Sequence, residues 1–324
     1  MSTPRVSVIL PTYNRAPLLA TAMDSILLQT FRDFELIVVD DGSADHTEAL
    51  VRRYQDADGR VKYIRKENGG ISSAMNAGLR AARGQLIARL DSDDRWLPEL
   101  LEIEVSILDA RPEIDLVYSK GQWALADLTP QSDTIGHALH FPEDALRSML
   151  WADSTCNITV VVRRECFDRA GFYDETLSTS EDWDMWLRIS LDSRFFFVDR
   201  VLAHVRSHEG SATGKTSLSF AAFLKERNKV LDKFFARSDL PPRIAAMRNI
   251  AYRNLYIFIG NMWIGARRPR RALGSFVRAF SVGGNPIATA ARIAWFGVVV
   301  RLISQTSLGR AVLVWESNRR LRRR

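Results

Sequence analysis

Cysteine is scarce in this sequence, and its scarcity argues against two kinds of architecture. The 324 residues contain only Cys156 and Cys166, with no C-x-x-C pair and no group of histidines at zinc-ligand spacing. The pattern indicates neither a disulfide framework nor a structural zinc site, and it favours a reducing, cytoplasmic environment. A secretory signal is also missing, because no positively charged start and no cleavage site flank the apolar residues that begin at Val6. We expect the chain to begin with the fold itself.

Long hydrophobic runs are missing as well. The most apolar stretch, Ile287 to Ser304, is interrupted by Arg292 and Arg301, which leave eight residues between them. Eight helical residues span only about 12 Å, too short to cross a bilayer. We expect an amphipathic helix that lies in the membrane interface, anchored by Trp295 and Phe296.

Acidic residues almost disappear from the C-terminal quarter. From residue 241 onward there are sixteen arginines, no lysine, no aspartate and only Glu316, so this segment carries +15, and the total of +7 leaves −8 for residues 1–240. The change predicts a globular domain over residues 1–240 and a basic helical extension over 241–324. We expect the Arg-rich tail, including Arg319 to Arg324, to bind an anionic membrane surface rather than nucleic acid. A disordered solubilising tail and a nucleic-acid contact are the alternatives.

Short apolar runs alternate with helix-length segments in the first part of the chain. The runs are 6–10, 34–39, 61–64 and 86–90, and this rhythm predicts βαβ units around a mainly parallel sheet. After about residue 110 the pattern loosens, with strands expected near 115–119, 158–162 and 195–198 and a polar loop near 128–136. The fold class is therefore α/β.

Polar turns follow the first two predicted strands. Pro-Thr-Tyr-Asn ends the first, at residues 11–14, and Asp40-Asp41-Gly42-Ser43 ends the second. The carboxyl ends of parallel strands form one crevice, where an aspartate can accept a hydrogen bond from a nucleobase or ribose and Tyr13 can stack on a base. The alternative is that these residues only favour turns.

Three carboxylates crowd the run Leu90 to Trp96, which reads LDSDDRW. Their mutual repulsion is costly unless a cation neutralises it, and hard oxygen ligands suit Mg²⁺ or Mn²⁺ together with substrate phosphates. The alternative is an acidic turn that caps a helix starting near Pro98.

A further acidic pair lies in the segment Ser180-Glu181-Asp182-Trp183. Ser180 is the expected N-cap of a helix, which places Asp182 in the first turn, where the helix dipole favours an ionised carboxylate. An ionised carboxylate suits a general base at neutral pH. The alternative is a pair of ordinary first-turn acids.

In order and approximate spacing, these motifs resemble the inverting family 2 glycosyltransferases of GT-A fold. The resemblance covers about residues 5 to 210 and rests on the segments VSVILPTYNR, LIVVDDGSADHT, ENGGISSAMNAGLRAARGQLIARLDSDD and SEDWDMWLR. It implies a Rossmann-like, mainly parallel sheet flanked by helices, with a C-terminal α-helical extension.

The resemblance also implies roles for individual residues. Asp182 matches the catalytic base, Asp93 and His208 match ligands of Mg²⁺ or Mn²⁺, and Glu181 and Trp183 are expected to shape the acceptor side. A lone histidine is also compatible with a structural role. The expected donor-binding residues are Pro11, Thr12, Tyr13, Asn14, Arg15, Asp41, Asn68, Gly70, Asn76, Asp91 and Ser92.

The sequence departs from the resemblance at Met75, where many relatives carry an arginine. Arg15 and Arg95 are the candidates to replace that contact. The segment QxxRW, typical of processive synthases in the family, is not found. Addition of a single sugar is therefore expected.

The predicted activity is that of a hexosyltransferase (EC 2.4). It would move one sugar from a nucleotide sugar, a UDP-sugar favoured, to a hydroxyl of a glycan or lipid-linked acceptor in cell-envelope polysaccharide synthesis, at the inner face of the cytoplasmic membrane. The alternatives are a sugar-nucleotidyltransferase, for which a Gly-rich phosphate loop is expected after the first strand, and a non-catalytic membrane scaffold. Slow hydrolysis of the donor would separate a transferase from a scaffold.

Overall fold

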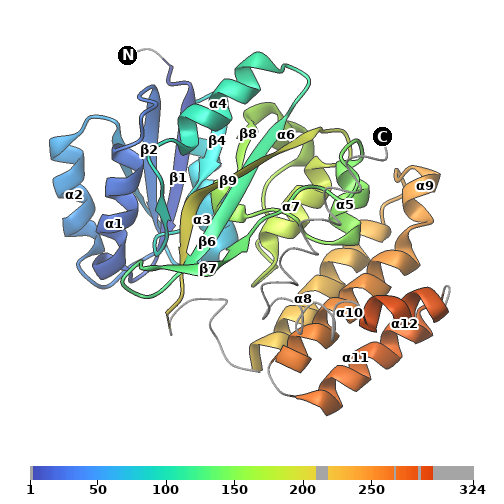
Figure 1. Cartoon of the computed structure of the whole chain (residues 1–324). Coiled ribbons are helices and arrows are strands. Elements are labelled where there is room, and N and C mark those ends of the chain that lie inside the picture. The colour runs from blue at the N-terminus through green and yellow to red at the C-terminus, as the bar shows by residue number, and fades with distance from the viewer. Residues whose placement is uncertain (1–2, 209–217, 266–267, 284–285, 295–324) are drawn as a thin grey trace. The chain divides into compact units, whose positions relative to one another are not determined.

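The computed structural model describes residues 3–208, 218–265, 268–283 and 286–294 (Figure 1). They belong to two compact units, Met1–Lys215 and Thr216–Arg324. The first unit is α/β and the second is helical. The predicted fold class, with its C-terminal helices, is confirmed.

One nine-stranded sheet forms the centre of the first unit, in the order β3-β2-β1-β4-β8-β6-β9-β5, with β7 paired to β6. Strands β1 to β4 are mutually parallel, β8 runs antiparallel to β4 and β6, and β9 is parallel to β6. The strands are β1 Val6–Thr12, β2 Phe34–Asp40, β3 Val61–Arg65, β4 Leu86–Arg89, β5 Arg95–Trp96, β6 Leu116–Ala124, β7 Pro130–Ile135, β8 Val161–Arg163 and β9 Phe195–Arg206.

Helices follow the strands of the first unit in the expected alternation (Figure 1). The four N-terminal strands predicted from apolar runs are confirmed, and each of β1, β2 and β3 is followed by one helix. The helices are α1 Ala16–Leu27, α2 Thr47–Ala57, α3 Gly70–Ala81, α4 Leu100–Ala110, α5 Ala145–Trp151, α6 Arg164–Ala170 and α7 Glu181–Ile189, with a 3₁₀ turn, η1, at Asn157–Thr159.

The central strands are buried on both faces, which explains why their sequences read as continuous apolar runs. Every residue of β1 and β2 is buried, as is typical of parallel strands covered by helices on both sides. Val8 belongs to the same core cluster as Leu19 and Met23 of α1. On the other face, Gly78 of α3 lies so close to Ile9 that a Cβ there would be 2.5 Å from the Ile9 Cγ2. The close packing of α1 and α3 holds the strand ends in fixed positions.

The prediction of a polar loop near residues 128–136 is wrong, because β7 occupies most of this segment. Five of its six residues are exposed, so its sequence shows no alternation of buried and exposed positions. The strand forms through backbone pairing with β6, in which Gly121 lies opposite Ile135 and Gln122 opposite Thr134. Pairing with a distant strand leaves little mark on local sequence.

The second unit consists of α8 Leu218–Phe235, α9 Pro242–Ala245, α10 Arg248–Gly265, α11 Pro269–Ser281 and α12 Pro286–Ala294. It begins before the predicted boundary at residue 240, because α8 packs against α10. The Tyr256 hydroxyl lies 3.2 Å from the Asn228 Oδ1, and the rings of Phe235 and Tyr252 are 6.3 Å apart. Long-range packing of this kind overrides a boundary drawn from charge alone.

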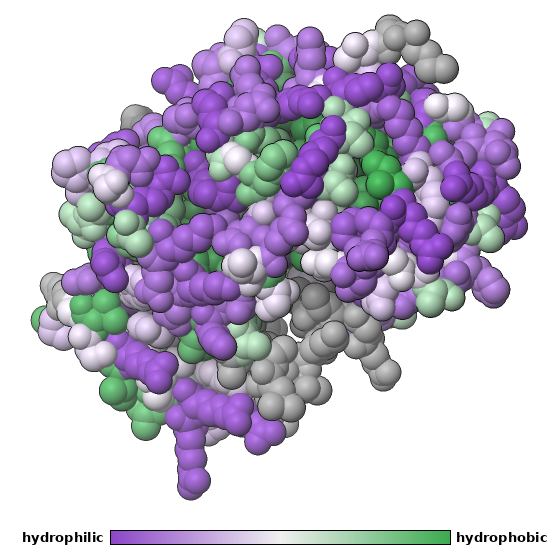
Figure 2. All heavy atoms as spheres, turned by 180° about the vertical axis from the view of Figure 1, so that it is seen from behind, coloured by the Kyte–Doolittle hydropathy of each residue, from purple (hydrophilic) through white to green (hydrophobic). Residues whose placement is uncertain are grey.

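Hydrophobic side chains reach the surface of the second unit (Figure 2). The large exposed ones are Phe258, Leu273, Val277, Phe280 and Ile287. Among the described residues, no helix combines the length and apolar character needed to cross a membrane. The interfacial helix expected over residues 287–304 is described only as far as the end of α12; Trp295, Phe296 and the segment 319–324 lie outside the described residues.

Candidate active site at the ends of the parallel strands

The loops after β1 and β2 are joined by hydrogen bonds. The Asn14 backbone N–H donates to the Ser43 Oγ at 2.9 Å, and the Asn14 Oδ1 accepts from the Ala44 N–H at 2.8 Å. Asn14 has a φ of 50°, a left-handed conformation that asparagine tolerates better than most residues. These bonds hold the two turns together at the predicted donor crevice; that both turns face one ligand stays a prediction.

Tyr13 lies at the tip of this pair of loops and is 49% exposed. About half of this side chain is therefore open to solvent, and its stacking on a base stays a prediction. The two residues before Tyr13 are buried rather than exposed. Pro11 and Thr12 lie in β1, and the Thr12 Oγ1 has no hydrogen-bond partner among the described residues. Both residues therefore belong to the buried part of β1.

Asp41 anchors the start of α3. Its carboxylate accepts from the Lys66 Nζ at 2.7 Å, from the Gly69 N–H at 3.0 Å and from the Gly70 N–H at 2.7 Å, while the Asn68 Nδ2 donates to the Asp41 carbonyl at 3.0 Å. Gly70 has a φ of +84°, which suits glycine. The Asp41 carboxylate therefore accepts its hydrogen bonds from the protein itself, and a direct contact with a nucleobase would have to replace one of them.

Asp93, Arg15 and His208 meet at the crevice from three distant parts of the chain. The Arg15 Nη1 donates to the Asp93 Oδ2 at 2.8 Å, the His208 Nε2 lies 2.9 Å from the same oxygen, and Arg15 and His208 are 3.0 Å apart. All three side chains are partly exposed. The two residues predicted to hold a metal are thus brought together, with a guanidinium beside them.

The donor set of this cluster suits a metal that takes only part of its coordination from the protein. Among the described residues, no group of three or more His, Cys, Asp and Glu side chains is placed to hold an ion. One carboxylate and one imidazole fit Mn²⁺ or Mg²⁺ when substrate phosphates and water supply the other ligands. The Arg15 guanidinium adds positive charge at the same point.

The other acids of the turn have different surroundings. Asp94 is buried and its Oδ1 accepts from the Arg206 N–H of β9 at 2.8 Å; burial and the charges of Asp93 and Asp91 raise the pKa of Asp94 well above its usual range. Ser92 is buried as well. Asp94 therefore fastens the turn to β9 and leaves Asp93 at the crevice.

Arg89 is a functional candidate that the sequence reasoning missed. This buried residue at the end of β4 donates from its Nε to the Asp91 Oδ1 at 2.8 Å and from its Nη1 to the Glu181 Oε1 at 3.2 Å. Burial alone would lower the pKa of Arg89, but the Asp91 and Glu181 carboxylates raise it above its ordinary value. The available signal was a cation inside an apolar strand, since a buried charge needs a partner.

The start of α7 lies next to this bridge. Asp182 follows Glu181 in the first turn, and its Oδ1 accepts from the Trp183 N–H at 2.7 Å. Ser180 is at the N-cap position, as predicted, but its φ of 63° is left-handed and its side chain makes no capping bond. Arg89 therefore connects the turn after β4 with the residue that precedes the predicted base.

Two further predicted site residues are buried and make hydrogen bonds to the surrounding structure. Trp183 is 4% exposed, and its Nε1 donates to the Met149 carbonyl of α5 at 3.3 Å. Asn76 is 1% exposed, and its amide contacts the Tyr173 backbone at 2.8 and 3.0 Å and the Glu175 Oε1 at 2.8 Å. Asn76 thereby fixes the loop before α7 to α3.

The burial of Met75 explains why an apolar residue is found at this position. It is 1% exposed in α3, so its side chain packs in the interior rather than facing the crevice. Of the two arginines expected to compensate, Arg95 contacts the His204 Nδ1 at 2.8 Å, and Arg15 is the one that lies beside Asp93.

Comparison with known proteins places the chain among glycosyltransferases. A family model described as glycosyl transferase family 2 matches residues 7–173. An uncharacterized glycosyltransferase of Rickettsia typhi is 30% identical over 244 residues, covering 70% of this chain and 73% of the relative. A chondroitin synthase of Pasteurella multocida is 29% identical over 198 residues, covering 61% of this chain and 20% of the synthase.

Two solved structures share the fold. Residues 1–349 of S. aureus TarS, in complex with UDP-GlcNAc, match with a TM-score of 0.63 and 21% identity over 93% of this chain and 83% of that one. The mannosyltransferase PcManGT of Pyrobaculum calidifontis, in complex with GDP-Man and Mn²⁺, matches with a TM-score of 0.61 and 21% identity over 96% of this chain and 86% of that one.

Proposed function

Because the chain belongs to glycosyl transferase family 2, we propose that it transfers a single sugar from a nucleoside diphosphate sugar to an acceptor hydroxyl with inversion of configuration. The family membership makes the chain a glycosyltransferase rather than a scaffold. The observation that carries the proposal is the meeting of Asp93, His208 and Arg15 beside the strand-end loops. Such a cluster is suited to a metal-bound diphosphate.

The donor binds in the crevice at the ends of β1, β2 and β4. Tyr13 stacks on the base, since its ring is exposed there. Asn14, Asn68 and Gly70 hold the loops that border the base and ribose. We favour a UDP-sugar, and the UDP-GlcNAc bound to TarS is compatible with this choice.

The diphosphate lies at Asp93. Asp93 and His208 would hold Mg²⁺ or Mn²⁺, and the bound ion supplies positive charge to the departing diphosphate. Arg15 adds a second cation at the same place, and its fork of N–H donors suits phosphate oxygens. Asp91, held by Arg89, faces the donor from the same turn.

Asp182 acts as the base. Its carboxylate removes the proton of the acceptor hydroxyl, the oxygen bonds to the anomeric carbon from the opposite face, and the bond to the diphosphate breaks. Asp182 lies in the first turn of α7, where the positive end of the helix dipole favours a negative charge. Glu181 cannot take this role while it pairs with the buried Arg89.

The acceptor is a glycan or a lipid-linked glycan in cell-envelope polysaccharide synthesis, and the second unit associates with an anionic membrane surface. Support comes from α11, where Leu273, Val277 and Phe280 are exposed on one stripe, and Arg270 is exposed near it. Exposed apolar residues flanked by arginine are typical of helices that lie in a membrane interface.

The test is binding and turnover with a panel of nucleotide sugars in Mg²⁺ or Mn²⁺, with a membrane lipid extract as acceptor. We expect Asp93→Ala to lose metal-dependent donor binding. Asp182→Asn should bind donor as the wild type does and lose turnover by about 10²- to 10⁴-fold, the usual contribution of a general base.

Asp56→Asn is the matched control, because Asp56 is exposed on α2 and makes no contact with the crevice. It should keep both properties. Failure of every nucleotide sugar to bind with either metal would overturn the proposed site, and normal turnover by Asp182→Asn would overturn the assignment of the base.

A further inference from the structure

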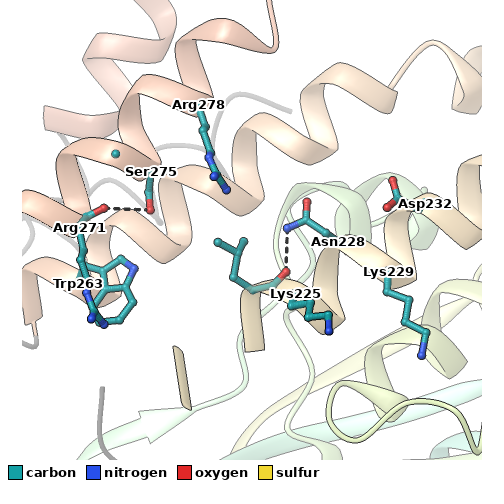
Figure 3. Close-up of a pocket in the computed structure, with 10 residues that line it drawn as sticks. Lys225, Asn228, Lys229, Asp232, Trp263, Arg271, Ser275 and Arg278 are labelled. Carbon is teal, nitrogen blue, oxygen red and sulfur yellow. Dashed lines mark hydrogen bonds between the residues drawn. The ribbon is translucent and has the colours of Figure 1, made fainter. Parts of the chain in front are cut away.

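The helical unit contains a basic pocket of about 840 Å³ between α8, α10 and α11 (Figure 3). Helix α8 contributes Lys225 and Lys229, and α11 contributes Arg271 and Arg278. Trp263 of α10 is 4% exposed and forms part of the wall. The pocket lies wholly within the second unit and shares no residue with the site at the strand ends.

Positive charge in this pocket is poorly neutralised. Lys225, Arg271 and Arg278 form no ion pair with a carboxylate among the described residues. Among the described residues of the lining, Asp232 is the only acid, and its Oδ1 already accepts a hydrogen bond from the Tyr252 hydroxyl. Like charges held near one another are destabilising, and a bound anion would offset that cost.

The arrangement is ordered by contacts of its own. The Arg271 guanidinium lies 4.8 Å from the centre of the Trp263 ring, a cation–π contact that restrains it. The Asn228 Nδ2 donates to the Leu224 carbonyl at 2.8 Å, between the two lysines of α8. Arg271 and Arg278 are two turns apart on α11, so they share one face of that helix. Cations from α8 and α11 therefore line one pocket.

We propose that this pocket binds the phosphate group of a phosphorylated ligand. At least three cations without acidic partners match a phosphate dianion better than a carboxylate, and arginine favours phosphate oxygens through paired donors. Nucleic acid fits less well, because it needs an extended basic track with accessible aromatic rings, whereas Trp263 is buried. The phosphate belongs either to a soluble ester or to a lipid headgroup.

The experiment compares Arg278→Glu with Arg268→Glu in the full-length protein. Both arginines are exposed, but Arg268, at the N-cap position of α11, does not line the pocket. Binding of glycerol phosphate by calorimetry tests the soluble source. Sedimentation with phosphatidylcholine vesicles that contain phosphatidic acid tests the lipid source. Lys225→Glu, on a different helix, is the second pocket variant.

We expect both pocket variants to weaken binding in at least one arm by about tenfold, the loss of one charge-assisted contact, and Arg268→Glu to change it less than about twofold. Equal losses of binding in all three variants would show that the protein responds only to net charge, and would overturn the proposal. Absence of binding to both glycerol phosphate and the phosphatidic acid vesicles would overturn it as well. Metal-dependent binding of the nucleotide sugar should stay unchanged in all three, so the two proposals fail independently.

Discussion

Replacement of Arg89 by methionine should destabilise the first unit and misplace α7. Methionine keeps much of the apolar stem but removes the charge that bridges Asp91 and Glu181. Loss of one partner from a buried ion pair costs about 3–5 kcal/mol because the other charge is left uncompensated. The Glu181 side chain is 8% exposed and bears most of this cost, whereas the Asp91 side chain, 31% exposed, can regain solvent.

A loss of about 3 kcal/mol should lower the Tm of this unit by roughly 6–12 °C, at about 2–4 °C per kcal/mol for a unit of this size. The assay is thermal unfolding of the wild type, Arg89→Met, Glu181→Gln and the double variant. We expect Glu181→Gln to rescue part of the loss in Arg89→Met, because the double variant no longer buries an unpaired carboxylate. The coupling free energy should exceed about 1 kcal/mol.

A conservative variant tests the geometry of the bridge. Arg89→Lys keeps the charge but not the planar fork that reaches two carboxylates, so its stability should lie between the wild type and Arg89→Met. Additive effects within about 0.5 kcal/mol, or wild-type stability in Arg89→Met, would refute the reasoning that this bridge holds the start of α7.

Four further predictions each concern one residue of the first unit and its immediate surroundings. Burial raises the pKa of Glu104 well above its usual range, so the folded state holds a proton that the unfolded chain releases above about pH 4.3. The free energy of unfolding therefore falls as the pH rises above that value. Because glutamine removes the titrating group, Glu104→Gln should raise Tm more at pH 8 than at pH 5, as thermal unfolding at the two pH values would show. Gly84→Ala should lower the free energy of unfolding in urea by about 1–3 kcal/mol, because its Cβ would lie 2.5 Å from the backbone of β1. Gly59→Ala is the control and should be neutral, because no atom lies within 4 Å of a Cβ at that position. Equal effects of the two substitutions would contradict the packing argument. Asn76→Ala should lower stability by about 1–3 kcal/mol, the cost of unpaired buried groups, and leave the affinity for donor measured on the folded protein nearly unchanged; a selective loss of donor affinity would instead support direct contact. Tyr13→Ala should weaken nucleotide binding by about 1–3 kcal/mol while Tyr13→Phe keeps it, and equal affinities in titrations of UDP would rule out stacking.

Much of the fold could be predicted from local pattern. The strands before residue 90 are buried on both faces, so their apolar runs marked them directly. β7 could not be found in this way, because its exposed residues carry no alternation and its pairing partner lies in another strand. The charge pattern did not indicate where the second compact unit begins, since α8 joins that unit through side-chain packing against α10.

The sequence by itself determined the order of the elements, the acidic turn at 91–94 and the first-turn position of Asp182, because turn residues, helix starts and apolar periodicity are local properties. Tertiary structure alone decided which side chains meet. Asp93 and His208 lie 115 residues apart in the chain, and Arg89 and Glu181 lie 92 apart. It also turned Asn76, Trp183 and Asp94 toward the framework and left Asp93 at the crevice. Burial and pairing of charge depend on the neighbours that the folded sheet brings together, and local sequence does not specify those neighbours.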